Sequence, residues 1–308
     1  MTTDYDVIVI GGGGAGLTAA LYAARAQLKT IIFEKDVIGG QISITDIVEN
    51  FPGFPQGISG PEISALIEEQ AKKSGAEIQF DEVEKIEPGE GAISVHVSGK
   101  ELKSKAVILA MGAQSRKLNI PSETEFIGRG VSYCAVCDAP FFRNKTVAVI
   151  GGGDSAIQEA IYLTKFATKV YVVHRRDQLR ASHVLQARAQ KNEKIEFIWD
   201  SVVHEIKGKN VVETVVLKNK KDDSLNEVAV NGVFVFIGHD PSSQIVKNLV
   251  QCDESGYVKT DLNYATSVTG VFACGEIRSG ATWQLVSSCG EGCSAALQAE
   301  KYLENFSE

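Results

Sequence analysis

The sequence predicts an α/β protein with two dinucleotide-binding domains, because one strand–turn–helix pattern occurs in it twice. A glycine run follows a short apolar strand at residues 11–16 and again at residues 151–156. Each run precedes a helix and a second apolar strand, which is the βαβ unit of a Rossmann-like fold. Chain crossings near residues 114–123 and 240–243 indicate that the second domain is inserted in the first. We therefore expect two Rossmann-like domains of the three-layer ββα type, formed by residues 1–115 with 245–308 and by residues 116–244.

The composition limits the classes of function that the chain can have. Hydrophobic residues make up 44% and charged residues 23%, which is typical of a soluble globular protein. The net charge of −8 argues against a nucleic-acid partner. Asp4 and Asp6 stand where a signal peptide is basic, and glycines interrupt the apolar run at residues 7–24, so neither a signal peptide nor a membrane span is expected. Six cysteines without a secretory signal favour the cytoplasm.

The first glycine run has the spacing of a phosphate-binding turn. A buried parallel strand is expected at residues 5–10, directly before it. Gly11 makes the tight turn, Gly13 lets the backbone approach a pyrophosphate, and Gly16 allows close packing of helix on strand. The next apolar strand ends in Glu34, where a carboxylate can accept hydrogen bonds from a ribose.

The elements between and after the two glycine runs are less strongly patterned. We expect a helix at residues 61–74, a β-meander over residues 77–108, a buried strand at 106–110, a strand at 270–275 and a helix from about residue 287 to the C-terminus. The last two return the chain to the first domain.

The second glycine run differs from the first in the residues that follow its βαβ unit. No acid stands where Glu34 stood; the second strand ends in His174, and Arg175, Arg176 and Arg180 follow. Guanidinium groups suit a 2′-phosphate because they offer planar paired donors to a doubly charged anion, so this site is expected to bind NADPH. The residues expected to contact it are Gly151, Gly153, Asp154, Ser155, Ala156, His174, Arg175, Arg176 and Arg180.

A Cys-x-x-Cys pair, Cys134 and Cys137, lies between the two glycine runs, with Asp138 directly behind it. A zinc site usually needs a second such pair, for which Cys289 and Cys293 are the nearest candidates. Buried cysteines without chemistry are a second interpretation. Redox use is favoured, because one thiol can attack a disulfide, the other can resolve the mixed disulfide, and an acid can hold the proton. The cysteines expected to serve in packing are Cys252, Cys274, Cys289 and Cys293. No metal is expected.

The ordered set of motifs resembles the low-molecular-weight bacterial and archaeal thioredoxin reductases, which contain FAD. The matching segments are residues 11–16, Gly39-Gly40-Gln41, residues 49–54, Cys134-Ala135-x-Cys137-Asp138, residues 151–156, His174-Arg175-Arg176-x-x-x-Arg180 and residues 270–275. The resemblance implies NADPH:thioredoxin-disulfide reduction by a homodimer that alternates between two domain orientations. It assigns FAD to residues 1–115 and 245–308 and NADPH to residues 116–244, the domain that carries the cysteines.

Roles for single residues also follow from the resemblance. Cys137 would lie against the flavin, Cys134 would attack thioredoxin's disulfide, and Asp138 would be the acid/base. Arg129 and an exposed pair, Phe141 and Phe142, would belong to the thioredoxin-docking surface. The residues assigned to FAD are Gly11, Gly13, Gly16, Glu34, Gly40, Gln41, Asn50, Gly112, Gly275, Glu276, Gln284 and Leu285.

Three positions near the flavin depart from the family pattern, and they keep alternative functions open. Met111 replaces a Thr, Glu276 replaces an Asp, and Trp283 stands where an Arg normally precedes the Gln. The alternatives are a relative that uses NADH, ferredoxin or F420 as donor, a dithiol oxidase, and an FAD-binding redox sensor without turnover. The flavoprotein of alkyl hydroperoxide reductase is set aside, because it resembles this chain with an extra N-terminal module. Ferredoxin:NADP reductases of this fold lack the Cys-x-x-Cys.

Overall fold

A computed structural model describes residues 3–45 and 47–304 of the chain. The chain forms two compact units, one of Met1–Gln114 with Asp240–Glu308 and one of Ser115–His239. They are called unit 1 and unit 2, and each is described by itself.

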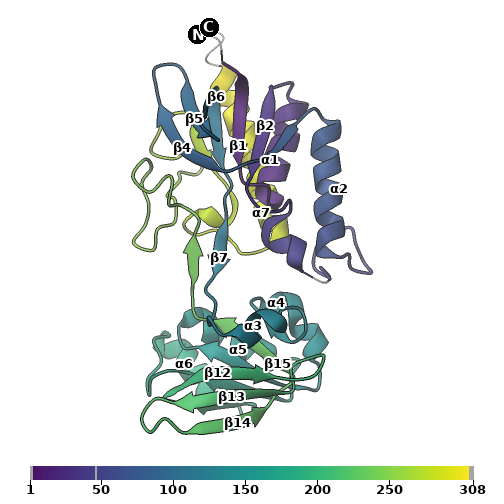
Figure 1. Ribbon diagram of the computed structural model, residues 1–308, viewed down its shortest axis with the longest axis vertical. Coiled ribbons are helices and arrows are strands. Elements are labelled where there is room, and N and C mark those ends of the chain that lie inside the picture. Colours follow the sequence, from purple (N-terminus) through teal and green to yellow (C-terminus); the bar gives the residue numbers. More distant parts are fainter. Residues whose placement is uncertain (1–2, 46, 305–308) are drawn as a thin grey trace. The chain divides into compact units, whose positions relative to one another are not determined.

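Unit 1 is built on a parallel sheet with helices packed against it (Figure 1). The strands that pair in parallel are β1 (Tyr5–Ile10), β2 (Thr30–Glu34), β3 (Glu77–Phe80), β6 (Lys100–Leu109) and β17 (Val271–Ala273). The helices are α1 (Gly14–Arg25), α2 (Gly60–Lys73) and α7 (Leu285–Glu304). Helices α1 and α7 pack against each other, and alanines of both lie in one apolar core with one face of the sheet. The expected helix to the C-terminus is described as far as Glu304; residues 305–308 lie outside the described residues.

Strand β6 contains the residues of two strands that were expected to be separate. Its first half pairs antiparallel with β5 (Ile93–Val97), which pairs with β4 (Val83–Pro88) to complete the predicted meander. Its second half pairs in parallel with β1, and its last four residues are buried. The expectation of a separate strand at residues 106–110 was therefore wrong, because no turn residue interrupts the run from the meander into the parallel sheet.

Unit 2 repeats the parallel sheet and adds an antiparallel one. The parallel sheet has the order β11 (Ile195–Ile198), β10 (Lys169–Val173), β9 (Thr146–Gly151), β15 (Gly232–Phe236) and β8 (Val131–Ser132). The antiparallel strands are β12 (Ser201–Lys207), β13 (Thr214–Asn219) and β14 (Leu225–Ala229). The helices are α3 (Pro121–Glu125), α4 (Ala135–Asp138), α5 (Asp154–Leu163) and α6 (His183–Gln190).

The two segments that connect the units pair with each other. They are β7 (Ala113–Ser115) and β16 (His239–Pro241), which form a two-stranded sheet (Figure 1). The short helical turns that complete the element order are η1 (Gly40–Ile44), η2 (Ala139–Phe142) and η3 (Gly275–Ile277).

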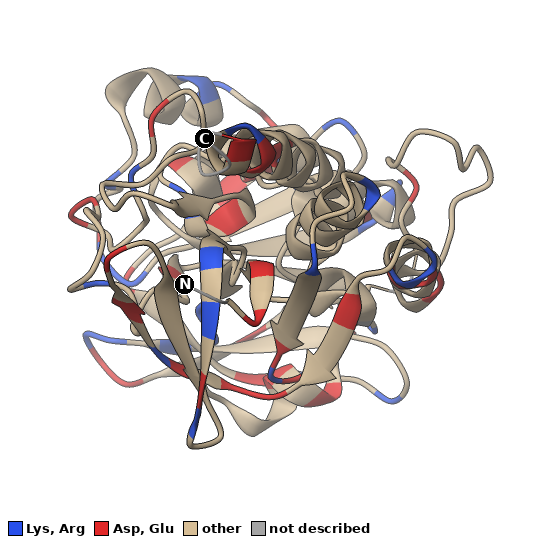
Figure 2. Ribbon diagram, turned by 90° about the horizontal axis from the view of Figure 1, so that it is seen from above, with Lys and Arg blue, Asp and Glu red and all other residues tan. Residues whose placement is uncertain are grey.

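Charge and hydropathy patterns agree with the composition. Acidic and basic positions are interspersed along the ribbon in the view of Figure 2. Among the described residues, no helix combines the length and the apolar character that crossing a membrane requires.

Candidate functional site

The first glycine turn joins β1 to α1 and leaves one side of its backbone open. Gly11 has a left-handed φ of +104°, and a Cβ there would collide with the Ala110 carbonyl. A Cβ on Gly16 would collide with the Gly11 carbonyl, so the helix packs directly on the turn. At Gly13 the nearest atom to such a Cβ is the Gly39 carbonyl oxygen, at 4.0 Å. A phosphate can approach this open backbone at the start of the helix, so the turn fits a dinucleotide.

Glu34 ends β2, and its carboxylate holds the glycine turn. Oε2 accepts a hydrogen bond from the Gly12 backbone N–H (2.6 Å), and Oε1 accepts one from the Asp36 backbone N–H (2.8 Å). The side chain is buried at 9% exposure. Each carboxylate oxygen has a second lone pair, so the group can fix the turn and still accept a ribose hydroxyl.

Further residues expected at the first nucleotide site surround this turn. The Cβ position of Gly40 lies 3.6 Å from the Cα of Gly13. Gly275, at φ +74°, is packed so closely on α1 that a Cβ would lie 2.8 Å from the Cβ of Ala15. Leu285 packs against the first residue of α1 from the start of α7. Segments more than 200 residues apart in sequence therefore converge on one turn.

Two of the other residues assigned to FAD, Asn50 and Gln284, are hydrogen-bonded to each other. Asn50 donates from Nδ2 to Oε1 of Gln284 (3.0 Å), which joins the loop before α2 to the segment before α7. Gln41 lies on η1 with an exposed side chain. Gly112 follows β6 in the left-handed conformation, with φ +62°. The structure thus supports the pairing of Asn50 with Gln284 most clearly.

The three departures from the family pattern have distinct surroundings. Burial, and then the charge of Glu291, raise the pKa of Glu276 to about 7. Near neutral pH this carboxyl can therefore either donate or accept a hydrogen bond. Trp283 makes an edge contact with Tyr257, with ring centroids 6.1 Å apart. Met111 packs against the apolar core of unit 1.

A partly buried ion pair holds the turn that carries Glu276, and sequence reasoning missed it. Glu291 of α7 accepts hydrogen bonds from the Gly275 backbone N–H (2.7 Å) and, in bidentate fashion, from Arg278 (3.0 and 3.1 Å). Arg278 also donates to Oγ1 of Thr260 (2.6 Å) and lies over the Tyr264 ring at 4.6 Å. Arg278 and Glu291 are separated by 13 residues in sequence, so no local pattern indicates the pair.

The dithiol of unit 2 is a disulfide in this structure. Cys134 and Cys137 are bonded to each other at the start of α4, and both are partly buried. The Cys137 backbone N–H donates to Sγ of Cys134 (3.2 Å), and the Cys134 backbone N–H donates to Oγ of Ser132 (3.1 Å). Asp138 follows at the end of α4, also partly buried. An N–H directed at Cys134 sulfur favours negative charge there.

The other four cysteines are free and lie in unit 1. Cys274 is fully buried, and burial raises its pKa. Burial also raises the pKa of Cys289, whose thiol donates to the Gly14 carbonyl (3.6 Å). The thiol form is thus favoured at both, which suits packing and not nucleophilic chemistry. In residues 3–45 and 47–304, no group of three or more His, Cys, Asp and Glu side chains could hold a metal.

The second glycine turn is followed by an arginine-bearing loop, residues 175–180, here called the arginine loop. Both Arg180 and Ala181 donate their backbone N–H groups to the Gly152 carbonyl, at 2.7 and 3.2 Å. Asp154, the first residue of α5, accepts the Ser182 backbone N–H (2.6 Å). These contacts tie the end of the loop to the turn. The loop's three arginines are exposed, and their guanidinium groups have no hydrogen-bond or ion-pair partner among the described residues.

Two polar atoms of unit 2 are buried without a partner, and one of them lies at this turn. Nε2 of His174 and Oε2 of Glu159 have no hydrogen bond within the described part of the chain. His174 is 4% exposed, and burial, then the charges of Arg180 and Arg175, lower its pKa. Burial raises the pKa of Glu159. Unpartnered buried groups are rare in proteins, so Nε2 of His174, whose ring lies against Gly152, is available to a ligand at this turn.

Glu159 is an unpartnered acid that sequence reasoning missed, although a signal for it existed. It lies on α5 between the buried residues Ala156, Ile157 and Ala160. An acidic residue within the apolar face of a helix can be recognised from the sequence alone, because it interrupts the helical spacing of the apolar residues.

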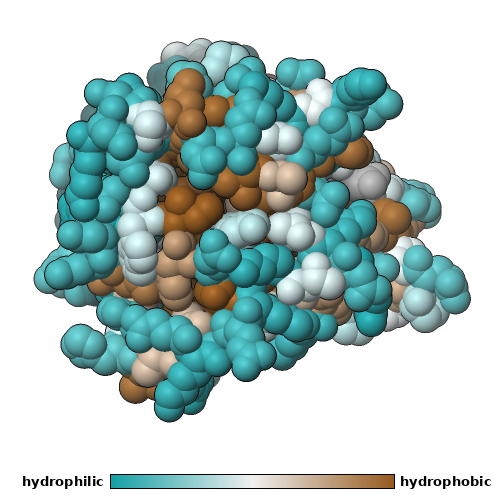
Figure 3. All heavy atoms as spheres, turned by 90° about the horizontal axis from the view of Figure 1, so that it is seen from below, coloured by the Kyte–Doolittle hydropathy of each residue, from teal (hydrophilic) through white to brown (hydrophobic). Residues whose placement is uncertain are grey.

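The expected docking surface needs one correction. Phe141 is 42% exposed and Arg129 is exposed, but Phe142 is only 8% exposed. Its ring packs edge-on against Phe234, with centroids 5.1 Å apart, and a Cβ on Gly232 would collide with it. The expectation of an exposed aromatic pair was therefore wrong for Phe142, which belongs to the core of unit 2. Hydrophobic residues lie among hydrophilic ones on the face shown in Figure 3.

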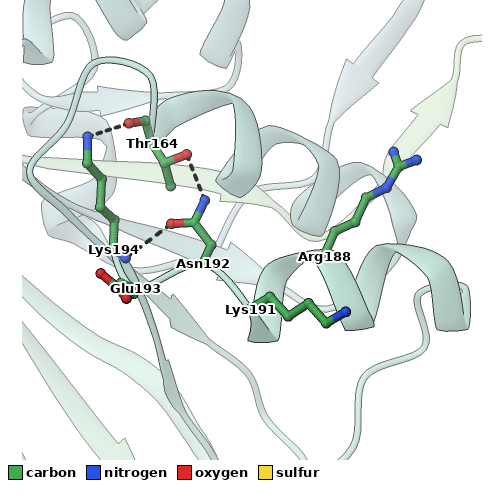
Figure 4. Close-up of a pocket in the computed structure, with 6 residues that line it drawn as sticks. All are labelled: Thr164, Arg188, Lys191, Asn192, Glu193 and Lys194. Carbon is green, nitrogen blue, oxygen red and sulfur yellow. Dashed lines mark hydrogen bonds between the residues drawn. The ribbon is translucent and has the colours of Figure 1, made fainter.

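A surface pocket of unit 2 has a structural explanation. Its lining residues are Thr164, Arg188, Lys191, Asn192, Glu193 and Lys194 (Figure 4). Lys194 donates from Nζ to the carbonyls of Thr164 (2.7 Å) and Ala167 (3.1 Å), just after α5 ends. A lysine that satisfies carbonyls at a helix C-terminus stabilises that end, and needs no ligand to account for it.

Comparison with known proteins agrees with this geometry. The sequence matches the pyridine nucleotide-disulphide oxidoreductase family over residues 5–292. A thioredoxin reductase of Peptoclostridium acidaminophilum is 48% identical over 316 residues, which cover 100% of both chains. That of Bacillus subtilis (strain 168) is 46% identical, over 99% of this chain and 96% of the relative. The crystal structure of thioredoxin reductase from Streptococcus pyogenes MGAS5005 superposes with a TM-score of 0.94 at 45% identity, over 98% of this chain and 99% of that chain.

These matches confirm the predicted fold class of two Rossmann-like domains and the resemblance that the motifs indicated. The chain belongs to the pyridine nucleotide-disulphide oxidoreductase family, and within it to the thioredoxin reductases.

Proposed function

We propose that the protein is a thioredoxin-disulfide reductase, an NADPH-dependent flavoenzyme that transfers two electrons to the disulfide of a thioredoxin-like protein. The observation that carries the proposal is the Cys134–Cys137 disulfide, placed in the unit that also bears the arginine loop. A disulfide of this kind in the same unit as a 2′-phosphate site suits reduction by NADPH better than it suits a zinc site or inert cysteines.

The reaction of the dithiol needs two electrons, two protons and the disulfide of the partner protein, and no other reactant. Two electrons and two protons convert the Cys134–Cys137 disulfide to two thiols. The Cys134 thiolate then attacks one sulfur of the partner's disulfide, and the other partner sulfur leaves as a thiolate. Cys137 attacks Sγ of Cys134 in turn, which releases the reduced partner and restores the starting disulfide. The N–H of Cys137 directed at Cys134 sulfur supports this choice of nucleophile.

Asp138 is the proposed acid/base for these steps. It lies next to Cys137 and is partly buried, so it is placed to hold the proton that a leaving thiolate requires. The measurement that tests it is the pH dependence of thioredoxin reduction. Asp138→Asn is expected to slow the reaction at least tenfold, by analogy with general acids, and to remove one limb of the pH profile.

Two nucleotides are assigned to the two turns. FAD, when bound at the turn of unit 1, supplies the two-electron chemistry that connects a nicotinamide to a disulfide. We assign its pyrophosphate to the open backbone at Gly13 and its ribose to Glu34. The 2′-phosphate of NADPH is assigned to Arg175, Arg176 and Arg180.

Steady-state assays separate this function from its alternatives. We expect thioredoxin reduction with NADPH, slower reduction with NADH, and loss of the activity in Cys134→Ser but not in the control Cys252→Ser. Activity only with reduced ferredoxin or F420 would replace the donor. Oxygen consumption driven by a dithiol would identify an oxidase, and a flavin that no donor bleaches would identify a sensor.

We also propose a cytoplasmic homodimer. Unit 1 leaves large apolar side chains exposed, among them Tyr22, Leu66, Val286 and Leu297. Exposed apolar surface of this kind is often covered by a second subunit. Four free thiols favour a reducing compartment. Analytical ultracentrifugation that finds only monomer at micromolar concentration would contradict the dimer, and cell fractionation tests the location.

A further inference from the structure

The arginine loop carries positive charge that nearby carboxylates partly cancel. Its three arginines are Arg175, Arg176 and Arg180, and Asp177 lies among them. Asp200 lies beside the loop, because its backbone N–H faces the Arg176 carbonyl at 3.4 Å. Asp154, which accepts the Ser182 backbone N–H just after the loop, adds a third carboxylate, so carboxylates offset much of the charge of the three guanidinium groups.

A hairpin between β13 and β14 lies against Asp200. The Lys220 backbone N–H donates to the Asp200 carbonyl (2.6 Å), and Nζ of Lys221 lies 2.6 Å from Oδ2 of Asp200. The hydrogen bond with Asp200, the charge of Asp200 and the charge of Asp177 raise the pKa of Lys221. The ammonium group of Lys221 therefore lies within electrostatic reach of two of the carboxylates that border the arginine loop.

Asp200 is held in place by its backbone as well as by this ion pair. It has a left-handed φ of +51°, directly before β12, and its side chain is only 18% exposed. The backbone contacts on both sides of it fix the carboxylate near the loop, whether or not a lysine faces it. The charge at position 221 therefore determines how strongly the negative charge of Asp200 acts on a ligand.

We propose that Lys221 is a specificity-determining residue for the 2′-phosphate. By pairing with Asp200 and opposing Asp177, it offsets part of the negative charge that borders the arginine loop and so favours a dianion there. This inference rests on the proposed use of NADPH. It assigns to the β13–β14 hairpin a role in choosing between phosphorylated and unphosphorylated nucleotides, without contact to the phosphate itself.

The test uses calorimetric binding of 2′,5′-ADP and of 5′-AMP to the full-length, FAD-loaded protein. We expect Lys221→Gln to weaken 2′,5′-ADP binding about three- to tenfold at roughly 50 mM salt, because opposite charges attract over about a Debye length. The loss is expected to shrink at roughly 500 mM salt. Binding of 5′-AMP should be unchanged, because it lacks the 2′-phosphate.

Three variants make the result decisive. Lys218→Gln is the matched control, since Lys218 pairs with Asp223 (2.8 Å) on the same hairpin, and it should bind 2′,5′-ADP as the wild type does. Lys221→Arg should retain wild-type affinity. Lys221→Gln combined with Asp200→Asn should recover most of the loss, because the unmasked carboxylate is then removed.

Each outcome has one meaning. If the wild type binds 2′,5′-ADP no better than 5′-AMP, the proposed NADPH specificity is wrong. If the wild type discriminates but Lys221→Gln binds 2′,5′-ADP unchanged, the role of Lys221 alone is overturned. Equal weakening by Lys218→Gln and Lys221→Gln would show a general charge effect of the hairpin, which also contradicts the proposal.

Discussion

Glu276 is largely buried and lies near the negative charge of Glu291, so its pKa is higher in the folded chain than in the unfolded chain. Its pKa rises from 4.5 to about 7, so the native state binds more protons than the unfolded state between these values. The free energy of unfolding therefore falls as the pH rises from 4.5 through about 7. The contribution of Glu276 to stability is fully present only below pH 4.5, where the group is protonated in both states.

The corresponding prediction concerns the protein stripped of FAD. Between pH 5 and pH 8 the wild type should lose about 2 kcal/mol of unfolding free energy relative to Glu276→Gln, which has no proton to release. Urea denaturation at the two pH values measures this. The exposed Glu254, replaced by Gln, provides the control and should keep the wild-type slope. A slope that persists in Glu276→Gln would assign the titration to another group.

At the scale of residues, the sequence predicted those whose role follows from local spacing. Gly11, Gly16, Cys134 and Cys137 belong to short motifs, and their geometry follows from the turn or helix that contains them. The surroundings of Glu276 depend on Glu291, from a helix that begins after it, and Phe142 is buried by packing against β15. Such contacts depend on tertiary packing, which spacing alone does not contain.

At the scale of elements, the Arg278–Glu291 pair joins α7 to the turn η3 and to the segment around Thr260. Arg278→Met would leave the Glu291 carboxylate buried without its cation, and is expected to cost about 3 kcal/mol or more in unfolding free energy. Arg278→Met with Glu291→Gln should recover most of the loss, because no buried charge remains and Gln still accepts the Gly275 N–H. Urea denaturation measures both. Equal losses in the single and double variants would contradict a charge-pair explanation.

Glu123 has the same kind of role in unit 2, where it joins α3 to the strand before the dithiol. Its carboxylate, 1% exposed, accepts hydrogen bonds from the backbone N–H groups of Leu118 (2.8 Å) and Asn119 (3.1 Å) and from the Tyr133 hydroxyl (2.8 Å). Burial, then the hydrogen bond to Glu123, raise the pKa of Tyr133, so its hydroxyl remains a donor.

A graded pair of variants tests this network. Tyr133→Phe removes one donor and should cost about 1 kcal/mol, whereas Glu123→Ala leaves three donors without an acceptor and should cost about 3 kcal/mol. Thermal or urea unfolding of both variants is the measurement. A larger loss in Tyr133→Phe than in Glu123→Ala would contradict this network, because removal of one donor would then cost more than removal of the acceptor that all three donors share.

Element types were predicted more securely than element boundaries. Strand β1 has the residues that its apolar run predicted, and β2 ends at Glu34 as predicted, because parallel strands buried on both faces are continuous apolar segments. The long strand β6 was divided in two by sequence reasoning, since its half-exposed beginning and buried end have different patterns. One strand can pair in antiparallel fashion along its first half and in parallel along its second, and the two halves then have different hydropathy patterns.

At the scale of the molecule, each unit has its own apolar cores. Those of unit 1 take no residue from 115–239, and those of unit 2 take all of theirs from it. We therefore expect FAD to stabilise one thermal transition and 2′,5′-ADP another in scanning calorimetry. A nucleotide at one hundred times its Kd should add about 2.7 kcal/mol to its own unit. If both ligands shift the same transition equally, the nucleotide sites are not divided between the units as proposed.

We propose that the Cys134–Cys137 disulfide accepts electrons from NADPH and passes them to a thioredoxin-like protein. The most direct measurement is an anaerobic titration of the FAD-loaded wild type and Cys134→Ser with NADPH, followed by addition of oxidised thioredoxin. The wild type should take up about two equivalents, one for the flavin and one for the disulfide, and reduce thioredoxin. Cys134→Ser should take up about one and leave thioredoxin oxidised. Equal uptake by both proteins, or thioredoxin reduction by the variant, would contradict the account.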